Sequence, residues 1–259
     1  MPAIAAAEKF GKTVLDLTEA WGRAWIFLFR TLVAIFSPPL RLQLIVNQLY
    51  QIGVNSTLVI ALIGLFTGAV LAVQGNYTLS KFGATAYVGS AVAISLIREL
   101  GPVLTALMVI GRAGSAITAE VGIMRITEQI DALKSMAVDP MKYLMAPRVL
   151  AGLFAMPLLT AIFIVVGIGG GYIVGVNLLG LSPGVMISEV DIIDVYSGLI
   201  KSIAFGFIFG WVACYKGYTC GFGAVGVNKA TTQSVVTASV AVLVVDYFLT
   251  SILTRVFME

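Results

Sequence analysis

The chain has 259 residues, of which 59% are hydrophobic and only 11% are charged. A soluble domain carries about 25% charged residues, so this chain has too few to cover a surface facing water and is expected to lie in lipid. It contains no histidine, which excludes histidine-based catalytic triads and zinc sites. Its 16 basic residues are scattered rather than clustered, so no nucleic-acid partner is predicted.

The segment from Phe10 to Arg30 is predicted to form an amphipathic helix. Apolar residues recur at spacings of three and four and share one face, namely Phe10, Val14, Leu17, Trp21, Trp25 and Leu28. Such a helix is typical of the membrane interface, so residues 1–39 are assigned to an interfacial helix. A soluble helix packed on a partner is the alternative. Charges throughout the first 25 residues predict no cleavable signal peptide.

Five apolar runs are long enough to cross a hydrocarbon layer of about 30 Å. They are expected at about residues 56–79, 87–119, 149–176, 197–215 and 234–256. An amphipathic stretch over 41–55 leads into the first, and a Gly-rich loop with Lys216 and Lys229 precedes the fifth. The predicted fold class is therefore an all-α integral membrane protein, with an interfacial helix followed by about five transmembrane helices in residues 40–259.

The distribution of lysine and arginine predicts the orientation of these spans. With the N-terminus in the cytoplasm, 12 of the 16 basic residues fall on the inner side, and Lys81 and Lys201 are expected at or near the outer loops. Cytoplasmic loops carry such an excess of basic residues. The N-terminus is thus predicted to be cytoplasmic and the C-terminus to lie on the outer side.

Arg98 and Glu99 lie inside the otherwise apolar second span. A charge at the centre of a bilayer costs at least about 2.5–3.5 kcal/mol, so these residues should face a bundle interior, a cavity or a partner. Neighbours on a helix point about 100° apart, so the two are expected to need separate partners. They could form a polar element of a substrate cavity or subunit seam, or a structural ion pair with another helix. Gly101 and Pro102 should loosen the helix beside them.

The segment from Glu120 to Asp139 is predicted to be a helix between two spans on the cytoplasmic side. Its apolar residues form one stripe, at Ile123, Ile126, Ile130, Leu133 and Ala137. It could be gripped by a motor subunit, or be an ordinary structured loop. The chain has no G-x-x-x-x-G-K-[ST] phosphate-binding loop, so any ATP hydrolysis would belong to another chain.

The long run RELGPVLTALMVIGRAGSAITAEVGIMRITEQIDALKSMAVDP, residues 98–140, resembles the MlaE (YrbE) family of permeases. The resemblance extends from about Asn47 to the C-terminus and includes the ATT run at 230–232 and Asp246 in the last span. It implies a homodimeric permease of an ABC transporter that moves phospholipids between the inner and outer membranes, maintains outer-membrane lipid asymmetry and resides in a bacterial inner membrane. It implies no cofactor in this chain, and partners that comprise an MlaF-like ATPase holding ATP and Mg, an MlaB-like STAS protein and an MlaD-like MCE-domain hexamer.

The resemblance also implies two sets of functional residues. The lipid-binding cavity would be lined by Leu71, Thr78, Leu79, Phe82, Arg98 and Glu99. The family often has a longer aliphatic residue at the position of Thr78 and tyrosine at that of Phe82. The ATPase-coupling helix would match residues 120–139, with Glu120, Met124, Arg125, Glu128, Gln129 and Asp139.

Three other functions remain as alternatives. A secondary transporter would carry inverted repeats and ionisable residues in several spans, whereas here they occur mainly in the second span, apart from Asp246. An intramembrane enzyme would need a nucleophile, an acid pair or a metal site, and the absence of histidine and of paired carboxylates within a span argues against it. A membrane scaffold without ATPase coupling would differ from a permease in failing to co-purify with an ATPase.

Overall fold

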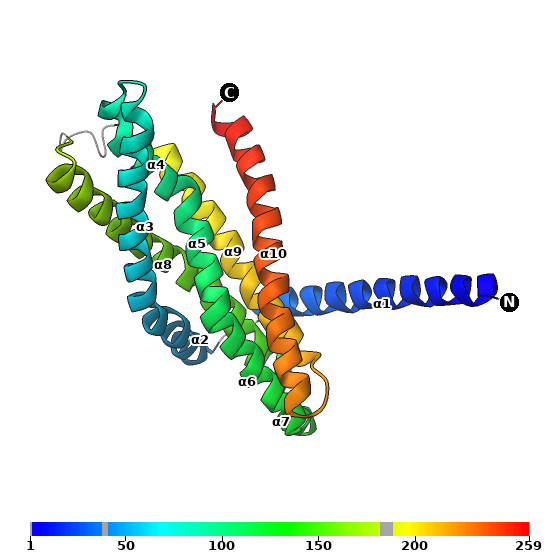
Figure 1. The fold of residues 1–259 in the computed structure, drawn as a ribbon. Helices are drawn as coiled ribbons and strands as arrows, with labels where there is room; N and C mark the ends of the chain where they lie inside the picture. The colour runs from blue at the N-terminus through cyan, green and yellow to red at the C-terminus, as the bar shows by residue number, and fades with distance from the viewer. Residues whose placement is uncertain (1, 38–40, 182–188, 259) are drawn as a thin grey trace.

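Apolar helices make up nearly all of the chain (Figure 1). The computed structural model describes residues 2–37, 41–181 and 189–258, and these residues contain no strand. Five helical segments are long and apolar enough to cross a membrane: Leu42–Ser80, Thr85–Ile126, Met141–Leu178, Ile192–Tyr218 and Gly223–Val256. The predicted fold class, an all-α membrane protein with five spans, is confirmed.

The spans are α-helices interrupted by short turns of other helical types. The first comprises α2 (Leu42–Leu49), π-helical η1 (Tyr50–Val54) and α3 (Asn55–Ser80). The second comprises 3₁₀-helical η2 (Thr85–Tyr87), α4 (Val88–Ser95), π-helical η3 (Leu96–Leu100), α5 (Gly101–Val109), π-helical η4 (Ile110–Gly114) and α6 (Ser115–Ile126). After α7 (Gln129–Ser135), the third comprises π-helical η5 (Met141–Met145), α8 (Ala146–Tyr172) and π-helical η6 (Ile173–Leu178), followed by α9 (Ile192–Tyr218) and α10 (Gly223–Met258).

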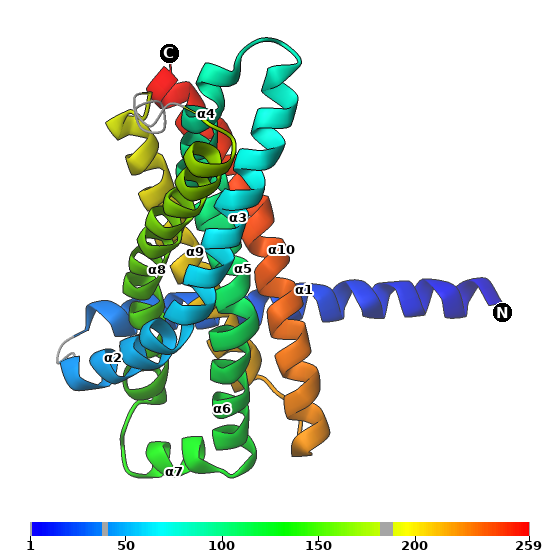
Figure 2. The same ribbon diagram turned by 60° about the vertical axis from the view of Figure 1, so that its left-hand side comes forward.

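The bundle has two ends: α7 lies at one and the turn between α3 and α4 at the other (Figure 2). We call them the α7 end and the Phe82 end, because Phe82 lies in that turn. Every span continues beyond its predicted apolar run at the α7 end, where polar side chains of neighbouring helices meet. Glu120 of α6, for example, lies 2.9 Å from Nη2 of Arg148 in the first turn of α8. Lys216 and Lys229, expected in a Gly-rich loop, lie instead in the last turn of α9 and early in α10.

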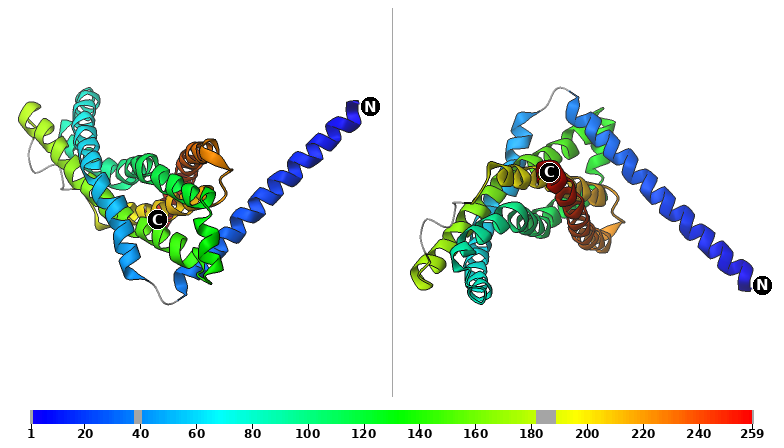
Figure 3. Two further views of the ribbon diagram at one scale, coloured as in Figure 1. Left: turned by 90° about the horizontal axis from the view of Figure 1, so that it is seen from below. Right: turned by 90° about the horizontal axis from the view of Figure 1, so that it is seen from above.

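The N-terminal helix α1 (Pro2–Phe36) runs across the direction of the spans, and its N-terminal part extends away from them (Figures 1 and 3). Its contact with the bundle is made by Phe27, Thr31 and Ala34, all buried. Trp21 and Trp25 remain 62% and 63% exposed. The two tryptophans of the predicted apolar face are thus exposed, while Phe27, Thr31 and Ala34 of the same helix are buried.

Glycines set how closely the spans approach. A Cβ atom on Gly64 of α3 would lie only 2.7 Å from the carbonyl oxygen of Phe163 on α8. A Cβ atom on Gly152 of α8 would lie 2.9 Å from the carbonyl oxygen of Gly206 on α9. Helices in lipid associate through such close backbone packing, because no hydrophobic force drives them together. Glycine therefore lets α8 pack tightly on both α3 and α9.

The single helix predicted over residues 120–139 is wrong. Helix α6 carries the second span on to Ile126, a turn follows, and the short α7 begins at Gln129. The break falls at Glu128, whose φ of 60° is left-handed, and a second left-handed residue, Ala137 with φ 58°, follows α7. The apolar stripe continues through the turn, so sequence periodicity does not reveal that the chain must turn here to reach α8.

Candidate functional site

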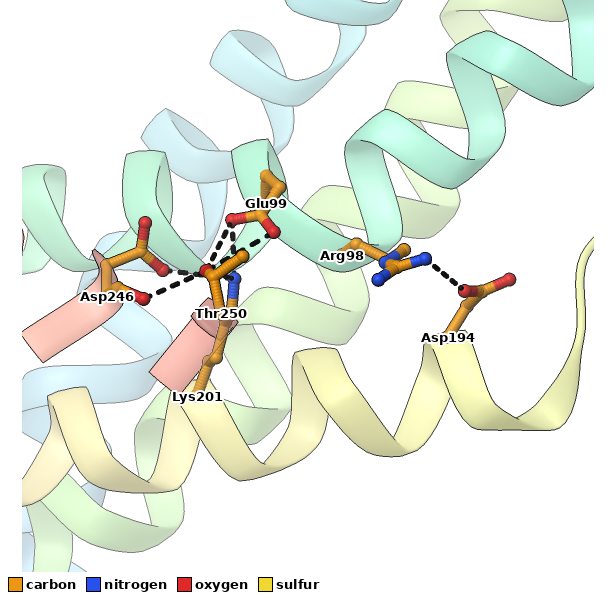
Figure 4. A network of polar contacts seen from close by, with 6 residues as sticks. All are labelled: Arg98, Glu99, Asp194, Lys201, Asp246 and Thr250. Atoms are coloured by element: carbon orange, nitrogen blue, oxygen red, sulfur yellow. Dashed lines mark hydrogen bonds and ion pairs between the residues drawn. The ribbon is translucent and has the colours of Figure 1, made fainter. Parts of the chain in front are cut away.

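A cluster of polar side chains joins three spans inside the bundle (Figure 4). Lys201 on α9 is only 1% exposed, and its ammonium group donates to Thr250 Oγ1 at 2.7 Å and lies 3.1 Å from Asp246 Oδ1. It also donates to a carboxylate oxygen of Glu99 on η3. One cation therefore connects η3, α9 and α10, and we call these four residues the Lys201 cluster.

The Lys201 cluster contains two carboxylates and one ammonium group. Burying an ion costs several kcal/mol unless a well-placed partner offsets the loss of water. Lys201 is enclosed, but the side chains of Glu99 and Asp246 are 39% and 19% exposed. A carboxylate inside a span does not face lipid at low cost. This side of the cluster is therefore suited to meet water or another protein surface.

Arg98 has a different partner from its neighbour Glu99 (Figure 4). Its guanidinium Nη1 lies 3.4 Å from Asp194 Oδ1, and the two side chains are largely buried. Asp194 lies in the first turn of α9, where its carboxylate also accepts a hydrogen bond from the backbone N–H of Asp191 at 3.1 Å. The separate partners expected for Arg98 and Glu99 are thus both supplied by α9.

One face of α9 supplies both partners because of a glycine between them. Asp194, Gly198 and Lys201 follow at spacings of four and three, which places them on one side of the helix. A Cβ atom on Gly198 would overlap the carbonyl oxygen of Ile97 in η3. The bare backbone of α9 therefore touches the turn that carries Arg98, and both ion pairs come within reach.

The π-helical turn η3 is explained by the proline that follows it. Pro102 has no backbone N–H to bond to the carbonyl of Arg98, and its ring crowds that turn. The N–H of Gly101 bonds instead to the carbonyl of Leu96, five residues earlier. The loosened helix expected at Gly101 and Pro102 is confirmed. Such π turns are frequent at functional sites.

The four remaining residues predicted for a lipid cavity lie towards the Phe82 end of α3 or just after it. Leu71 and Leu79 are partly buried and pack against the hydrophobic core. Thr78 is exposed, and Phe82 is 79% exposed. Only the two leucines are covered by the chain itself. A cavity with all four residues in its wall would need a second wall from outside the chain.

Two of the residues predicted for ATPase coupling have partners within the bundle. Glu120 of α6 lies 2.9 Å from Nη2 of Arg148, which lies in the first turn of α8 and is only 3% exposed. Met124 packs against the hydrophobic core. Both residues therefore belong to the contact between α6 and the rest of the bundle.

Arg125, also predicted for coupling, fastens α7 to α6. Its Nη1 lies 3.2 Å from Asp131 Oδ2, and its guanidinium is 5.8 Å from the centre of the Tyr218 ring. Hydrogen bonds from Lys134 and Arg125 hold the pKa of the Asp131 carboxyl below its ordinary range, and the bond to Asp131 raises the pKa of Lys134. The turn between α6 and α7 is thus held by charge.

The other three residues predicted for coupling line the surface of the α7 segment. Glu128 and Gln129 are exposed at the start of α7. Asp139 is exposed as well, and its carboxylate accepts a hydrogen bond from the backbone N–H of Met141 at 2.9 Å, just before α8. Glu128 and Gln129 are therefore the predicted residues best placed to meet a partner.

The position of Lys201 differs from the one predicted from the sequence, and Asp194 is a further functional residue that was not predicted. Lys201 was expected near an outer loop, but it is buried in α9 and is the centre of the cluster. A lysine seven residues after an aspartate, within an apolar run, is the signal that could have found this face of α9. Which carboxylates pair with Lys201 depends on how the helices pack against each other, and local periodicity does not reveal that packing.

The chain is similar to known proteins over most of its length. The family model described as permease MlaE matches residues 45–252. The "Intermembrane phospholipid transport system permease protein MlaE" of Haemophilus influenzae is 45% identical over 250 residues, which cover 94% of this chain and 95% of that protein. A "Probable ABC transporter permease protein" of Rickettsia felis is 42% identical over 254 residues, which cover 96% and 98%. The chloroplastic protein TRIGALACTOSYLDIACYLGLYCEROL 1 of Arabidopsis thaliana is 34% identical over 209 residues, which cover 79% and 60%. With most of its length matched by the family model, this chain belongs to the MlaE permease family.

Proposed function

We propose that this chain is the permease subunit of an ABC transporter that moves phospholipid between the inner and outer membranes of a bacterial envelope. Membership of the MlaE family supports this function, as does the name of the Haemophilus relative. In this transporter the chain carries the lipid path, and a separate ATPase binds ATP and Mg. Its work maintains the lipid asymmetry of the outer membrane.

The observation that carries the proposal is the partly open side of the Lys201 cluster. Glu99 and Asp246 keep part of their side chains uncovered inside spans, where lipid contact is unfavourable. The last span is also the least covered, with 11% of its most apolar window buried, against 50% for the second span. A second copy of the chain, packed near α10, would cover the carboxylates and enclose a polar chamber between the two copies.

This chamber offers both halves of a phospholipid a suitable surface. Leu71, Leu79 and Phe82 provide apolar contact for acyl chains, and Thr78 lies beside them. Arg98 is the group for the phosphate, because a guanidinium donates two parallel hydrogen bonds to phosphate oxygens. Since Arg98 pairs with Asp194, binding of a head group by Arg98 is linked to release of that ion pair.

The two ends of the bundle have different roles in this proposal. The α7 end, rich in lysine and arginine, faces the cytoplasm together with the N-terminus, and the C-terminus faces the periplasm. Glu128 and Gln129 contact an MlaF-like ATPase, which is accompanied by an MlaB-like STAS protein. An MlaD-like MCE-domain hexamer receives lipid at the opposite end.

The test compares lipid binding by matched variants in the assembled transporter. The double variant Arg98→Gln/Asp194→Asn removes both charges of one ion pair and so leaves no unpaired buried charge. It should retain less phospholipid per dimer and transfer less lipid per ATP hydrolysed. Lys81→Gln, at an exposed cation of the Phe82 end, is the control. Unchanged lipid content and transfer in the double variant would refute the role of Arg98.

A secondary transporter is a second candidate, because the ionisable residues of the Lys201 cluster come from three different spans. The two functions predict different energy sources. Lipid transfer in vesicles that contain the ATPase and no ion gradient supports the ABC transporter. Transfer that requires an ion gradient and proceeds without ATP supports the alternative.

A further inference from the structure

Two neighbouring pockets lie where α1 meets the α7 end of the bundle. The larger, of about 460 Å³, is lined by residues of α1, the end of α9, the following loop and the start of α10. The smaller, of about 170 Å³, lies between α1, the end of α9 and Met141. Arg23, Tyr215 and Thr219 line both pockets, so the two share a wall.

The larger pocket is strongly basic. Arg23, Lys216 and Lys229 line it, and no carboxylate is among its lining residues. Within the described part of the chain, neither lysine has an ion-pair partner. Arg23 pairs with Glu19 at 3.1 Å, but both side chains are more than 60% exposed, so that pair contributes little. Three cations therefore line this pocket, and within the described part of the chain only Arg23 has an ion-pair partner, which is exposed.

The smaller pocket is mostly apolar. Ile26, Phe27 and Met141 line it, and the Phe27 ring packs against Tyr215 and Tyr218 with centroids 5.4 and 5.6 Å apart. Arg30 contributes the second cation on this side. A basic chamber thus adjoins an apolar one at the helix expected to lie in the membrane interface.

We propose that these pockets form a binding site for an anionic phospholipid, with its phosphate between Lys216 and Lys229 and its apolar part beside Phe27. Basic pockets between membrane helices on the cytoplasmic side bind anionic head groups, and each cation near such a surface adds to the attraction. The adjoining apolar chamber favours a lipid over a free anion. Bound there, the lipid joins α1 to the ends of α9 and α10.

This site is separate from the proposed transport chamber. Lys216 follows Lys201 by fifteen residues on α9, which is roughly 22 Å along a helix that rises about 1.5 Å per residue. The site takes a resident lipid that stabilises the interfacial helix, and its existence does not depend on which cargo the transporter carries. It goes beyond the proposed function, and the two can fail independently.

The experiment measures phosphatidylglycerol bound to the purified full chain after exchange into phosphatidylcholine. Lys216→Gln/Lys229→Gln should lower the retained phosphatidylglycerol by roughly tenfold or more, since each lost cation weakens the attraction severalfold. The control Lys81→Gln/Arg255→Gln removes the same charge at the Phe82 end and should retain the normal amount. Lys229→Gln alone, at an exposed position, should give a smaller loss and covers the case in which the double variant does not fold.

Three results would overturn the proposal. Equal retention by the double variant and by its control means that the lysines hold no lipid. Inorganic phosphate that stabilises the chain against heat as strongly as phosphatidylglycerol does, with no lipid retained, means that the pocket binds a free anion. Loss of ATPase association with unchanged lipid retention means that these lysines dock a protein. Loss of retained phosphatidylglycerol in the lysine variants but not in the control, with lipid transfer by the assembled transporter unchanged, supports the proposal.

Discussion

The ammonium group of Lys201 lies 3.1 Å from the carboxylate of Asp246, so that α9 and α10 are joined by charge inside their spans. The same ammonium group reaches Glu99 of η3, and Thr250 accepts a further hydrogen bond from it. Both carboxylates of the cluster, Glu99 and Asp246, thus have Lys201 as their ion-pair partner. The arrangement makes Lys201 the residue whose loss should be felt most widely.

Replacing Lys201 with methionine should destabilise the chain by roughly 3–5 kcal/mol, because two carboxylates would remain near each other without a cation. Thermal unfolding in detergent, followed by helical circular dichroism, measures this loss. The triple variant Glu99→Gln/Lys201→Met/Asp246→Asn, which removes all three charges, should recover much of the stability. Lys81→Met, at an exposed lysine, should change little. A fully stable Lys201→Met protein would contradict the central role of this cation.

Replacing Gly198 with alanine should separate α9 from η3, because the new methyl group would overlap the carbonyl oxygen of Ile97. Such overpacking costs about 1–3 kcal/mol, and both ion pairs of η3 with α9 should weaken. Gly169→Ala is the matched control, since nothing lies within 4 Å of a Cβ atom there. The measurement is the difference in unfolding temperature between the two variants. Equal temperatures would show that the close contact at Gly198 does not matter.

The ion pairs of Asp131 should hold at neutral pH and weaken only at the extremes. The pair with Arg125, which crosses the α6–α7 turn, should be lost in acid, and the pair with Lys134, which lies within α7, should be lost in strong base. The pKa of Asp131 is lowered, so its contribution is present above the ordinary value of 3.8 and is lost as the pH falls through the lowered pKa. The pKa of Lys134 is raised, so its contribution is present below the ordinary value of 10.5 and is lost as the pH rises through the raised pKa.

Asp131→Asn should imitate the acid state at neutral pH. Amide hydrogen exchange of residues 129–135 should become faster in this variant, while exchange in α8 stays the same. Glu128→Gln, one turn earlier and without a part in the Asp131 contacts, is the control. Unchanged exchange in Asp131→Asn would show that the ion pairs do not hold α7.

The two ends of the bundle should be reached from opposite sides of the membrane. In a chain carrying Cys214→Ala and Cys220→Ser, the variant Lys81→Cys should react with a membrane-impermeant thiol reagent added to intact spheroplasts. The variant Gln129→Cys should react only after the inner membrane is permeabilised. Both positions are exposed, so access to the reagent does not require unfolding. Labelling of Gln129→Cys from outside would reverse the proposed orientation.

Sequence by itself determined the class of the molecule. Apolar runs of sufficient length predicted the spans, because a hydrocarbon core requires about 20 apolar residues in a row. The pair Arg98 and Glu99, followed by Gly101 and Pro102, predicted a polar and loosened turn, because a proline without an N–H acts locally. Family resemblance in residues 98–140 pointed to the permease, which the family match over residues 45–252 supports.

Tertiary structure alone decided which charges meet and where helices stop. Lys201 contacts Asp246 because α9 and α10 pack together at the level of these two residues. It contacts Glu99 because Gly198, which has no side chain, lets η3 approach α9 closely. Neither contact follows from local periodicity. The helix breaks at Glu128 although the spacing of apolar residues continues through this position, since the chain has to turn towards α8. Local patterns record which face of a helix is apolar, whereas contacts between distant segments depend on how whole helices pack.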